Sequence, residues 1–236
     1  MSIASLTPSF RHRLRQMRFQ CRTALVRYRL ATVDFSSGLC QSVWLLYDLA
    51  RSLQPQVCVE IGSAQGWSSC HIGLALRENV RGKLYAIDPH QPTDWNDQNA
   101  VASLPILQRN LRRCGLESYV EIVRATSEVA AIGWDRPIDL LFIDGDHSYA
   151  GVKRDWELFS PHLSPFGVTV FHDATWELHG PNRPDMGVPR FLEELRAEGY
   201  PLVTLDRDYG LTLVQARRGG QPLAANPPTP ADPGSR

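Results

Sequence analysis

Five ionisable side chains that could do acid–base or metal chemistry follow two apolar segments of the chain. They are Asp144, Asp146, His147, His172 and Asp173, in FIDGDHSY and VFHD. If both segments are parallel strands of one sheet, their carboxyl ends meet at the same edge, and we expect the five side chains to converge there. Unpaired buried charges cost several kcal/mol each, so such a cluster indicates a functional site rather than a structural one.

A glycine-containing loop, EIGSAQG at residues 60–66, leaves one apolar segment and opens a helix. Gly62 would let the backbone turn tightly, and Gly66 would let a ligand approach the start of the helix. The NAD fingerprint needs further glycines where this chain has Ala64 and Trp67, so a pyrophosphate cradle is a poor fit. Asp88, at the end of LYAID, stands where an acid could accept both hydroxyls of a ribose. The expected ligand is therefore an adenosine that carries something other than a pyrophosphate.

Apolar and amphipathic segments alternate along most of the chain. We expect strands at 57–61, 83–88, 119–123, 138–144 and 167–173, and helices at 67–79, 105–115, 127–132, 149–163 and 188–199. The segments PLVTLD and LTLVQA, separated by RDYG, predict an antiparallel hairpin. The expected fold class is α/β, with a doubly wound, Rossmann-like sheet that is mostly parallel, has an antiparallel C-terminal strand and carries helices on both faces.

Both ends of the chain differ from this central domain, which we expect at residues 55–216. Residues 1–54 predict a helical extension, and its Arg-rich first helix has an apolar stripe at three- and four-residue steps, formed by Phe10, Leu14, Met17, Cys21, Leu25 and Tyr28. The stripe would pack on the domain or on a second subunit, giving a homodimer; an anionic membrane surface or an acidic partner is the alternative. Residues 217–236 are rich in proline and predict a disordered tail.

Composition excludes several classes of protein. The formal net charge is zero, so nothing global indicates a nucleic-acid partner. No apolar run approaches about 18 residues, which argues against a transmembrane segment, and the N-terminus lacks the apolar region of a secretory signal. The five cysteines are scattered without metal or redox spacing, so we expect reduced thiols and a cytoplasmic location.

The pattern E-x-G-x-x-x-G-x-S at residues 60–68, with Asp88 after the second strand, resembles the class I S-adenosylmethionine-dependent methyltransferases. Their final strand is also antiparallel. The segment from Phe142 to Asp173 is similar to the methyltransferase domain 24 branch, whose members include antibiotic-sugar O-methyltransferases and cephalosporin hydroxylase-like proteins. The resemblance runs from about Val57 to Gln215 and implies S-adenosyl-L-methionine as the cofactor.

The resemblance also implies cofactor contacts. Glu60, Gly62, Ser63 and Gly66 would line its methionine part, and Ser68, at a helix N-terminus, would meet its carboxylate. Asp88 would bind the ribose, Thr126 and Ser127 would border the adenine, and Asp144 would complete the set. Helix capping is the structural alternative for the serines and the threonine, and for Ser127 the two are evenly balanced.

At the reaction centre, the residues of metal-dependent relatives that hold a cation match Asp144 and Asp173, with His172 in place of a third acid. Carboxylates suit a hard divalent cation such as Mg²⁺, whereas His172 would favour a softer metal or would orient Asp173 from outside the metal site. His147 falls where these relatives place the base, and its ordinary pKa near 6.5 suits that role. Asp146 is the competing base, or the residue that orients His147.

The predicted function is metal-assisted O-methylation of a hydroxyl on a sugar or a small polar metabolite. One alternative is an iron oxygenase in which His147, His172 and one Asp hold the metal; another is a cofactor-binding or assembly module without turnover. The acceptor would lie under the loops HQPTDWNDQN and TWELHGPNRPDMG. Their Trp95, Trp176 and His179 would stack on a sugar ring or anchor the loops.

Overall fold

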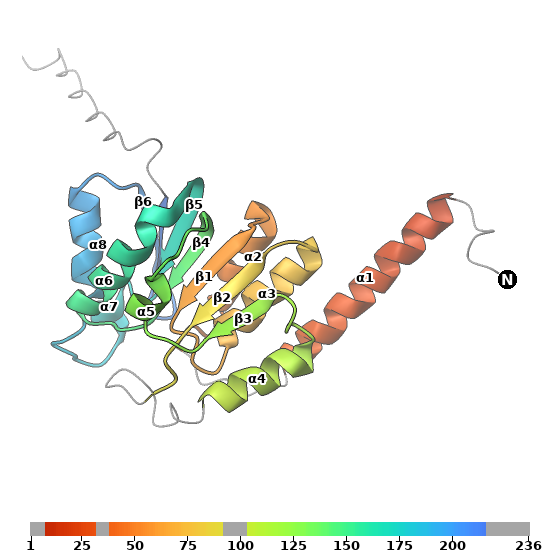
Figure 1. Cartoon of the computed structure of the whole chain (residues 1–236), viewed down its shortest axis with the longest axis horizontal. Helices are drawn as coiled ribbons and strands as arrows, with labels where there is room; N and C mark the ends of the chain where they lie inside the picture. The colour runs from red at the N-terminus through yellow and green to blue at the C-terminus, as the bar shows by residue number, and fades with distance from the viewer. Residues whose placement is uncertain (1–7, 32–37, 92–102, 216–236) are drawn as a thin grey trace, which may run out of the picture.

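The structure is a computed structural model that describes residues 8–31, 38–91 and 103–215 (Figure 1). Its strands are β1 (Val57–Ile61), β2 (Lys83–Ile87), β3 (Val120–Val123), β4 (Ile138–Ile143), β5 (Leu163–Phe171), β6 (Leu202–Leu205) and β7 (Leu211–Gln215). Its helices are α1 (Pro8–Ala31), α2 (Val43–Leu53), α3 (Trp67–Asn79), α4 (Ser103–Cys114), α5 (Ser127–Ala131), α6 (Tyr149–Phe159), α7 (Trp176–His179) and α8 (Val188–Ala197), with a 3-10 turn at Ser160–His162.

The seven strands form one sheet in the order β3-β2-β1-β4-β5-β7-β6. Neighbouring strands from β3 to β5 pair in parallel, and β7 pairs antiparallel with both β5 and β6. The chain runs outward from β1 to β3 and then returns to β4, so the strand order reverses between β1 and β4. Ligands bind at such a reversal, beyond the carboxyl ends of the strands. The predicted doubly wound sheet and its C-terminal hairpin are confirmed.

The sheet has a hydrophobic core on each face. Alternate residues of β4 show the division, because Leu140 and Phe142 join one core whereas Leu141 and Ile143 join the other. The first core includes buried side chains of α2, α3 and α4, and the second those of α6 and α8. β4 is therefore buried on both sides from Leu140 to Ile143, as the absence of apolar–polar alternation in this segment predicts.

The N-terminal helices share the first core with the sheet. From α2, Leu46 and Ala50 are fully buried in it, and from α1, Val26 and Leu30 are buried. The described members of the predicted apolar stripe on α1, namely Met17, Cys21, Leu25 and Tyr28, are exposed, so the domain does not cover these four side chains. The expected domain boundaries remain predictions, and the tail lies outside the described residues. None of the described helices has the length and apolarity to cross a membrane.

Candidate active site

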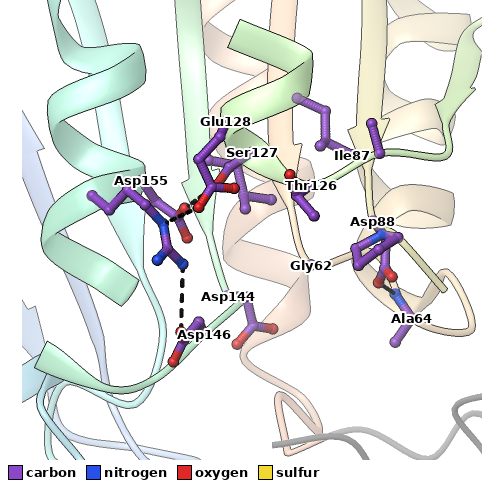
Figure 2. A pocket seen from close by; sticks show the side chains of 15 residues that line it. Gly62, Ala64, Ile87, Asp88, Thr126, Ser127, Glu128, Asp144, Asp146 and Asp155 are labelled. Carbon is purple, nitrogen blue, oxygen red and sulfur yellow. Dashed lines mark hydrogen bonds and ion pairs between the residues drawn. The ribbon is translucent and has the colours of Figure 1, made fainter. Parts of the chain in front are cut away.

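A pocket of about 260 Å³ opens at the carboxyl ends of β1, β2 and β4, where the strand order reverses (Figure 2). It is lined by the last residues of β1 and β2, by four strand-to-helix loops, and by residues of α5 and α6: Ile61, Gly62, Ala64, Ile87, Asp88, Pro89, Ala125, Thr126, Ser127, Glu128, Asp144, Gly145, Asp146, Arg154 and Asp155. Glu60, Ser63, Gly66 and Ser68 are not among the lining residues. The pocket therefore holds part of the predicted cofactor set, together with two residues of α6 that were not predicted.

Two glycines shape the loop after β1, for different reasons. Both have a φ of 89°, which other residues rarely adopt. A Cβ at Gly62 would lie 2.0 Å from the carbonyl oxygen of Asp144, so this glycine lets the loops after β1 and β4 touch. A Cβ at Gly66 would lie 2.3 Å from Cδ1 of Leu107 on α4. Gly66 was expected to admit a ligand, and the structure places a packed leucine beside it.

Glu60 is fully buried at the end of β1 and accepts a hydrogen bond from Ser69. Burial raises the pKa of Glu60 to about 7, against the lowering effect of hydrogen bonds from Ser68 and Ser69. One carboxylate oxygen of Glu60 and the hydroxyl of Ser63 are buried without a hydrogen-bond partner in the described chain. Buried polar atoms are rarely left unpaired, so these two favour a polar ligand group beside the loop.

Asp88 is a buried carboxylate held by main-chain amides at the pocket wall. Its Oδ2 accepts from the amide of Ala64 at 2.8 Å, and its Oδ1 from the amide of His90 at 2.6 Å. His90 also lies 2.8 Å from the hydroxyl of Ser103 through Nδ1. Each Asp88 oxygen keeps acceptor capacity for a ligand hydroxyl. His90 was not predicted, because its sequence position in a proline-rich loop gives no signal.

At the other end of the pocket, Thr126 and Ser127 have distinct roles (Figure 2). Thr126 caps α5 by accepting from the amide of Val129 at 3.5 Å. The hydroxyl of Ser127 donates to Oδ1 of Asp155 at 2.5 Å. Asp155 is buried, which raises its pKa to about 6 despite the hydrogen bond from Ser127. Sequence reasoning missed Asp155 because a charged residue within an amphipathic helix usually faces water.

Asp146 turns toward the start of α6 rather than toward His147. Its Oδ1 accepts from the amide of Ser148 at 2.9 Å, and its Oδ2 lies 3.4 Å from Nη2 of Arg154. Arg154 also pairs with Glu128 at 2.8 Å. Asp146 thus stabilises the loop that carries His147, through the main chain.

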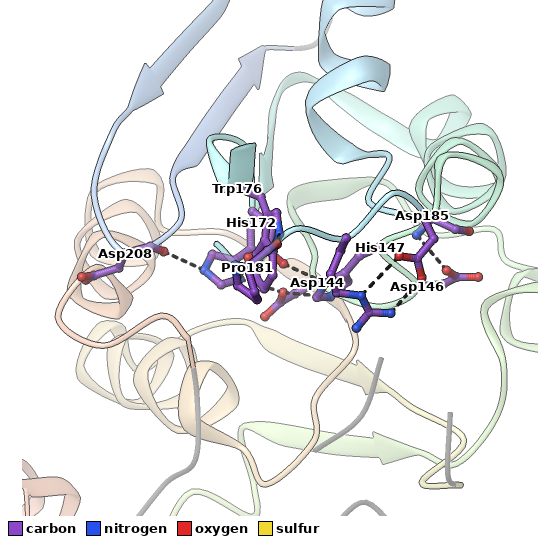
Figure 3. Close-up of polar contacts among 11 residues, drawn as sticks. Asp144, Asp146, His147, His172, Trp176, Pro181, Asp185 and Asp208 are labelled. Atoms are coloured by element: carbon purple, nitrogen blue, oxygen red, sulfur yellow. Dashed lines mark hydrogen bonds and ion pairs between the residues drawn. The ribbon is translucent and has the colours of Figure 1, made fainter. Parts of the chain in front are cut away.

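The other four members of the predicted cluster do converge, and Figure 3 labels three of them, Asp144, His147 and His172. His147 lies 2.8 Å from Oδ2 of Asp173 through Nδ1 and 3.6 Å from Oδ1 of Asp144 through Nε2. His172 lies 3.0 Å from the same Asp144 oxygen and 3.4 Å from Asp173 through Nδ1. The Nε2 of His172 lies 3.0 Å from the main-chain oxygen of Asp208, in the turn between β6 and β7. We call these two histidines and two aspartates the quartet.

Electrostatics balance the quartet internally. Burial alone would lower the pKa of His172, but Asp144 and Asp173 outweigh it and raise the pKa to about 9. For His147, burial is likewise outweighed by Asp173 and Asp144, and the pKa lies above its ordinary value. For Asp173, contacts with both histidines overcome burial and lower the pKa. Since both nitrogens of His172 face oxygen acceptors, its ring donates on both sides and carries a positive charge.

A family model for methyltransferase domain 24, described as "Methyltransferase domain", matches residues 59–174. The match covers the glycine loop, Asp88 and the whole quartet. The match, over 116 of the 236 residues, identifies residues 59–174 as a methyltransferase domain.

Solved structures of other methyltransferases share this fold. The O-methyltransferase TomG from Streptomyces achromogenes, solved with SAM, is 21% identical with a TM-score of 0.60 over 84% of this chain and 89% of that chain. An O-methyltransferase from Bacillus cereus, in complex with SAH, is 18% identical with a TM-score of 0.60 over 84% and 91%. The SAH-bound methyltransferase PaMTH1 from Podospora anserina is 16% identical with a TM-score of 0.59 over 92% and 99%.

Two curated relatives are more similar in sequence. One is the uncharacterized protein y4gI of Sinorhizobium fredii, 29% identical over 198 residues, which are 78% of this chain and 20% of the relative. The other is the uncharacterized protein R132 of Acanthamoeba polyphaga mimivirus, 29% identical over 133 residues, which are 55% of this chain and 57% of the relative. The methyltransferase chain thus spans about a fifth and just over half of the lengths of these relatives.

The residues whose donor atoms could hold one metal ion differ from the predicted ligands Asp144, Asp173 and His172. One ligand atom each from Asp144, His147 and Asp173 lie within 4.8 Å of one another, close enough to surround a single cation. His172 was predicted as a ligand, but both its nitrogens face protein oxygens, and a ring in that state offers no lone pair. The residues therefore fit a cation held by two carboxylates and the imidazole of His147.

Two residues that were expected either to stack on a sugar or to anchor a loop contact mainly the turn between β6 and β7. The ring of Trp176 stacks on Tyr209 with centroids 4.8 Å apart, and its Nε1 donates to the carbonyl of Pro181 at 2.9 Å. His179 is exposed and pairs with Asp206 at 2.6 Å. These contacts favour anchoring of the loop over stacking on a sugar. Trp95 lies outside the described residues.

Proposed function

We propose that this methyltransferase transfers a methyl group from S-adenosyl-L-methionine to a hydroxyl oxygen of a sugar or another small polar metabolite. One observation carries the proposal: Asp144 lines the pocket that contains Asp88 and also contacts both histidines of the quartet. A cofactor pocket and an acid–base cluster thus share a carboxylate. That arrangement suits a reaction in which an acceptor hydroxyl loses its proton next to the bound cofactor.

In the pocket, Asp88 would accept hydrogen bonds from both ribose hydroxyls. Its two main-chain contacts fix the carboxylate before any ligand arrives, so little side-chain freedom is lost on binding. The unpartnered oxygens of Glu60 and Ser63 would meet the amino-acid end of the cofactor. Adenine would lie toward Thr126, Ser127 and Asp155.

The bound cofactor would supply an electrophilic methyl group. His147 would remove the proton from the acceptor hydroxyl through Nε2, because Nδ1 lies 2.8 Å from Oδ2 of Asp173 and would carry the other proton. Asp173 would hold this tautomer and stabilise the imidazolium that forms. Asp173 is in turn held near the positive ring of His172.

A divalent cation is the second candidate for activating the hydroxyl, and the geometry of Asp144, His147 and Asp173 favours it. When bound, the cation would lower the pKa of the acceptor hydroxyl. A donor set that includes an imidazole suits manganese, iron or zinc as well as the Mg²⁺ that the sequence favoured. Turnover that survives excess chelator would assign activation to His147 alone, whereas turnover restored by one metal would identify the cation.

The two other functions have less support. An iron site of two histidines and one carboxylate would need one nitrogen of His172 as a ligand. Both nitrogens already face other groups, Asp144 and the main-chain oxygen of Asp208. A module without turnover would not explain why two histidines and two aspartates pair with one another beside the pocket.

The decisive experiment mixes the full chain with S-adenosyl-L-methionine and an array of hydroxylated metabolites, and follows the mass gain of one methyl group together with S-adenosylhomocysteine. The Asp88→Ala variant is the control for turnover that depends on the pocket. Absence of cofactor binding by calorimetry contradicts the proposal. Tight binding without any methylated product would instead support the module.

A further inference from the structure

The outer face of α1 carries large apolar side chains that the domain leaves uncovered. The exposed fractions are 68% for Tyr28, 56% for Met17 and 48% for Leu25, and Cys21 is exposed between them. These residues recur at steps of four, four and three, so they share one face of the helix. They are also the described members of the stripe that the sequence sets apart. We call Met17, Cys21, Leu25 and Tyr28 the outer stripe.

The other side of α1 fixes the direction in which the outer stripe points. Val26 and Leu30 are buried in the core of the domain. The guanidinium of Arg27 lies 5.1 Å from the ring centroid of Trp44 and donates to the hydroxyl of Tyr47 at 3.1 Å. These contacts hold the C-terminal end of α1 on the body of the protein. The outer stripe consequently faces away from that body.

The N-terminal part of α1 projects beyond the rest of the molecule (Figure 1). The helix has 24 residues and is therefore about 36 Å long. Among its described side chains, none before Val26 is buried. A helix without tertiary contacts is only marginally stable in water, so this part of α1 needs a surface on which to lie.

The charge of the segment decides what that surface is. Residues 1–30 hold seven arginines and no acidic residue, whereas the remaining residues hold 18 basic and 25 acidic ones. Two such helices from two copies would repel each other. A partner must combine apolar contact for the outer stripe with negative charge for the arginines. An anionic lipid surface offers both, because its headgroups lie level with guanidinium groups and its acyl chains lie beneath.

We propose that α1 is an interfacial anchor that attaches the protein to anionic lipid bilayers, with the outer stripe inserted at the level of the acyl boundary. The five arginines that precede Val26 supply electrostatic attraction, and the apolar side chains supply burial, whereas Arg27 and Arg29 contact the body of the protein. This attachment is independent of the methyl-transfer proposal, since α1 contributes no residue to the pocket or the quartet.

Vesicle co-sedimentation of the full chain tests this. We expect binding to vesicles of phosphatidylcholine mixed with phosphatidylglycerol, little binding to pure phosphatidylcholine, and release by salt. The variant Met17→Ser/Leu25→Ser/Tyr28→Ser should weaken binding on the order of tenfold or more, because apolar burial is lost. A matched control replaces three exposed apolar residues elsewhere, Val80→Ser/Ile132→Ser/Leu178→Ser, and should leave vesicle binding unchanged.

Circular dichroism of both triple variants should show intact folding, because every replaced side chain is exposed. The proposal is overturned if the wild-type chain ignores anionic vesicles, or if both triple variants bind as the wild type does. Sedimentation velocity separates a further outcome. A wild-type dimer that ignores vesicles, and that the α1 variant alone converts to a monomer, would show that a second copy covers the outer stripe.

Discussion

Two carboxylates that line the same pocket, Asp88 and Asp144, are held in different ways. Main-chain amides of Ala64 and His90 fix Asp88. Side chains of His172 and His147 contact Asp144. Amides that belong to a fold have the same charge at every working pH, whereas imidazoles titrate and can be replaced one at a time. Under the proposed function, the side of the site that contains Asp88 would bind the cofactor with an affinity that changes little with pH, whereas the quartet would move a proton.

The largest effect should come from His147→Ala. Loss of a positioned base typically costs about 10²–10⁴ in rate, so we expect kcat to fall by that factor. Affinity for S-adenosyl-L-methionine, measured by calorimetry, should change little, because the ring contacts Asp144 and Asp173 rather than the ribose end of the pocket. Near-normal turnover would show that His147 is not the base and that the quartet does not carry out the proton transfer.

The wild-type rate should also fall on acidification, since a protonated His147 cannot accept the hydroxyl proton. The carboxylates outweigh burial and raise the pKa of His147, so this acid limb should lie above the ordinary value of 6.5. The limb should disappear from the residual activity of His147→Ala. A limb that persists unchanged in the variant would assign it to another group.

Asp88→Ala comes next. Charge-assisted hydrogen bonds contribute about 1.5–3 kcal/mol each, so cofactor affinity should weaken roughly tenfold to a hundredfold or more. Asp88→Asn is the matched variant: it keeps one acceptor oxygen and the shape, and should lose less. If wild type and Asp88→Ala bind the cofactor with equal affinity, Asp88 does not contact the cofactor.

Asp155→Asn should change the pH dependence of stability. The folded protein raises the pKa of Asp155 from 3.8 to about 6, so the folded state holds this proton more tightly than the unfolded state. The contribution of Asp155 to the free energy of unfolding is therefore largest below about pH 4. It declines by an amount on the order of 1–3 kcal/mol as the pH rises to about 6, and it is constant above that pH. Asparagine can still accept from Ser127.

Urea unfolding of wild type and Asp155→Asn should consequently give similar free energies near pH 4. The variant should be the more stable of the two at pH 7.5. If the free energies of unfolding of the two proteins change in parallel between pH 4 and pH 7.5, burial does not raise the pKa of Asp155.

The smallest effect on turnover should come from Asp146→Ala. Asp146 contacts the amide of Ser148 and the side chain of Arg154, and an exposed ion pair contributes about 0–1 kcal/mol. We expect turnover within about tenfold of wild type and a modest loss of thermal stability. A loss as large as that of His147→Ala would make Asp146 the base, and a double variant would then show whether the two act together.

Much of the fold could be predicted because local patterns determine it. The apolar residues 140–143 of β4 predicted the buried central strand, and the RDYG turn predicted the terminal hairpin. Element ends were less accurate: β5 begins at Leu163, where the sequence indicated the end of a helix. Ser164, Pro165 and Phe166 carry no clear strand period.

The candidate site was predictable where strand ends bring residues together, and not where the partner is a main-chain atom or a distant helix. The convergence of Asp144, His147, His172 and Asp173 follows from neighbouring β4 and β5. The pairing of His172 with the carbonyl of Asp208, 36 positions later, has no signal in residue type. The contact between the Leu107 side chain and Gly66 could not be predicted from the sequence either, because it depends on how α4 packs.

The contact between His172 and Asp208 also sets an order of events during synthesis. The Asp208 side chain accepts from the amide and the hydroxyl of Ser42, at 3.0 and 2.8 Å, so the turn between β6 and β7 joins the start of α2 in the N-terminal extension to the quartet. A ribosome releases Ser42, His147 and His172 long before it releases Asp208, and N-terminal segments fold first. The nascent chain therefore carries both histidines and both aspartates without the carbonyl that orients His172. His172 gains this contact only when the hairpin of β6 and β7 closes.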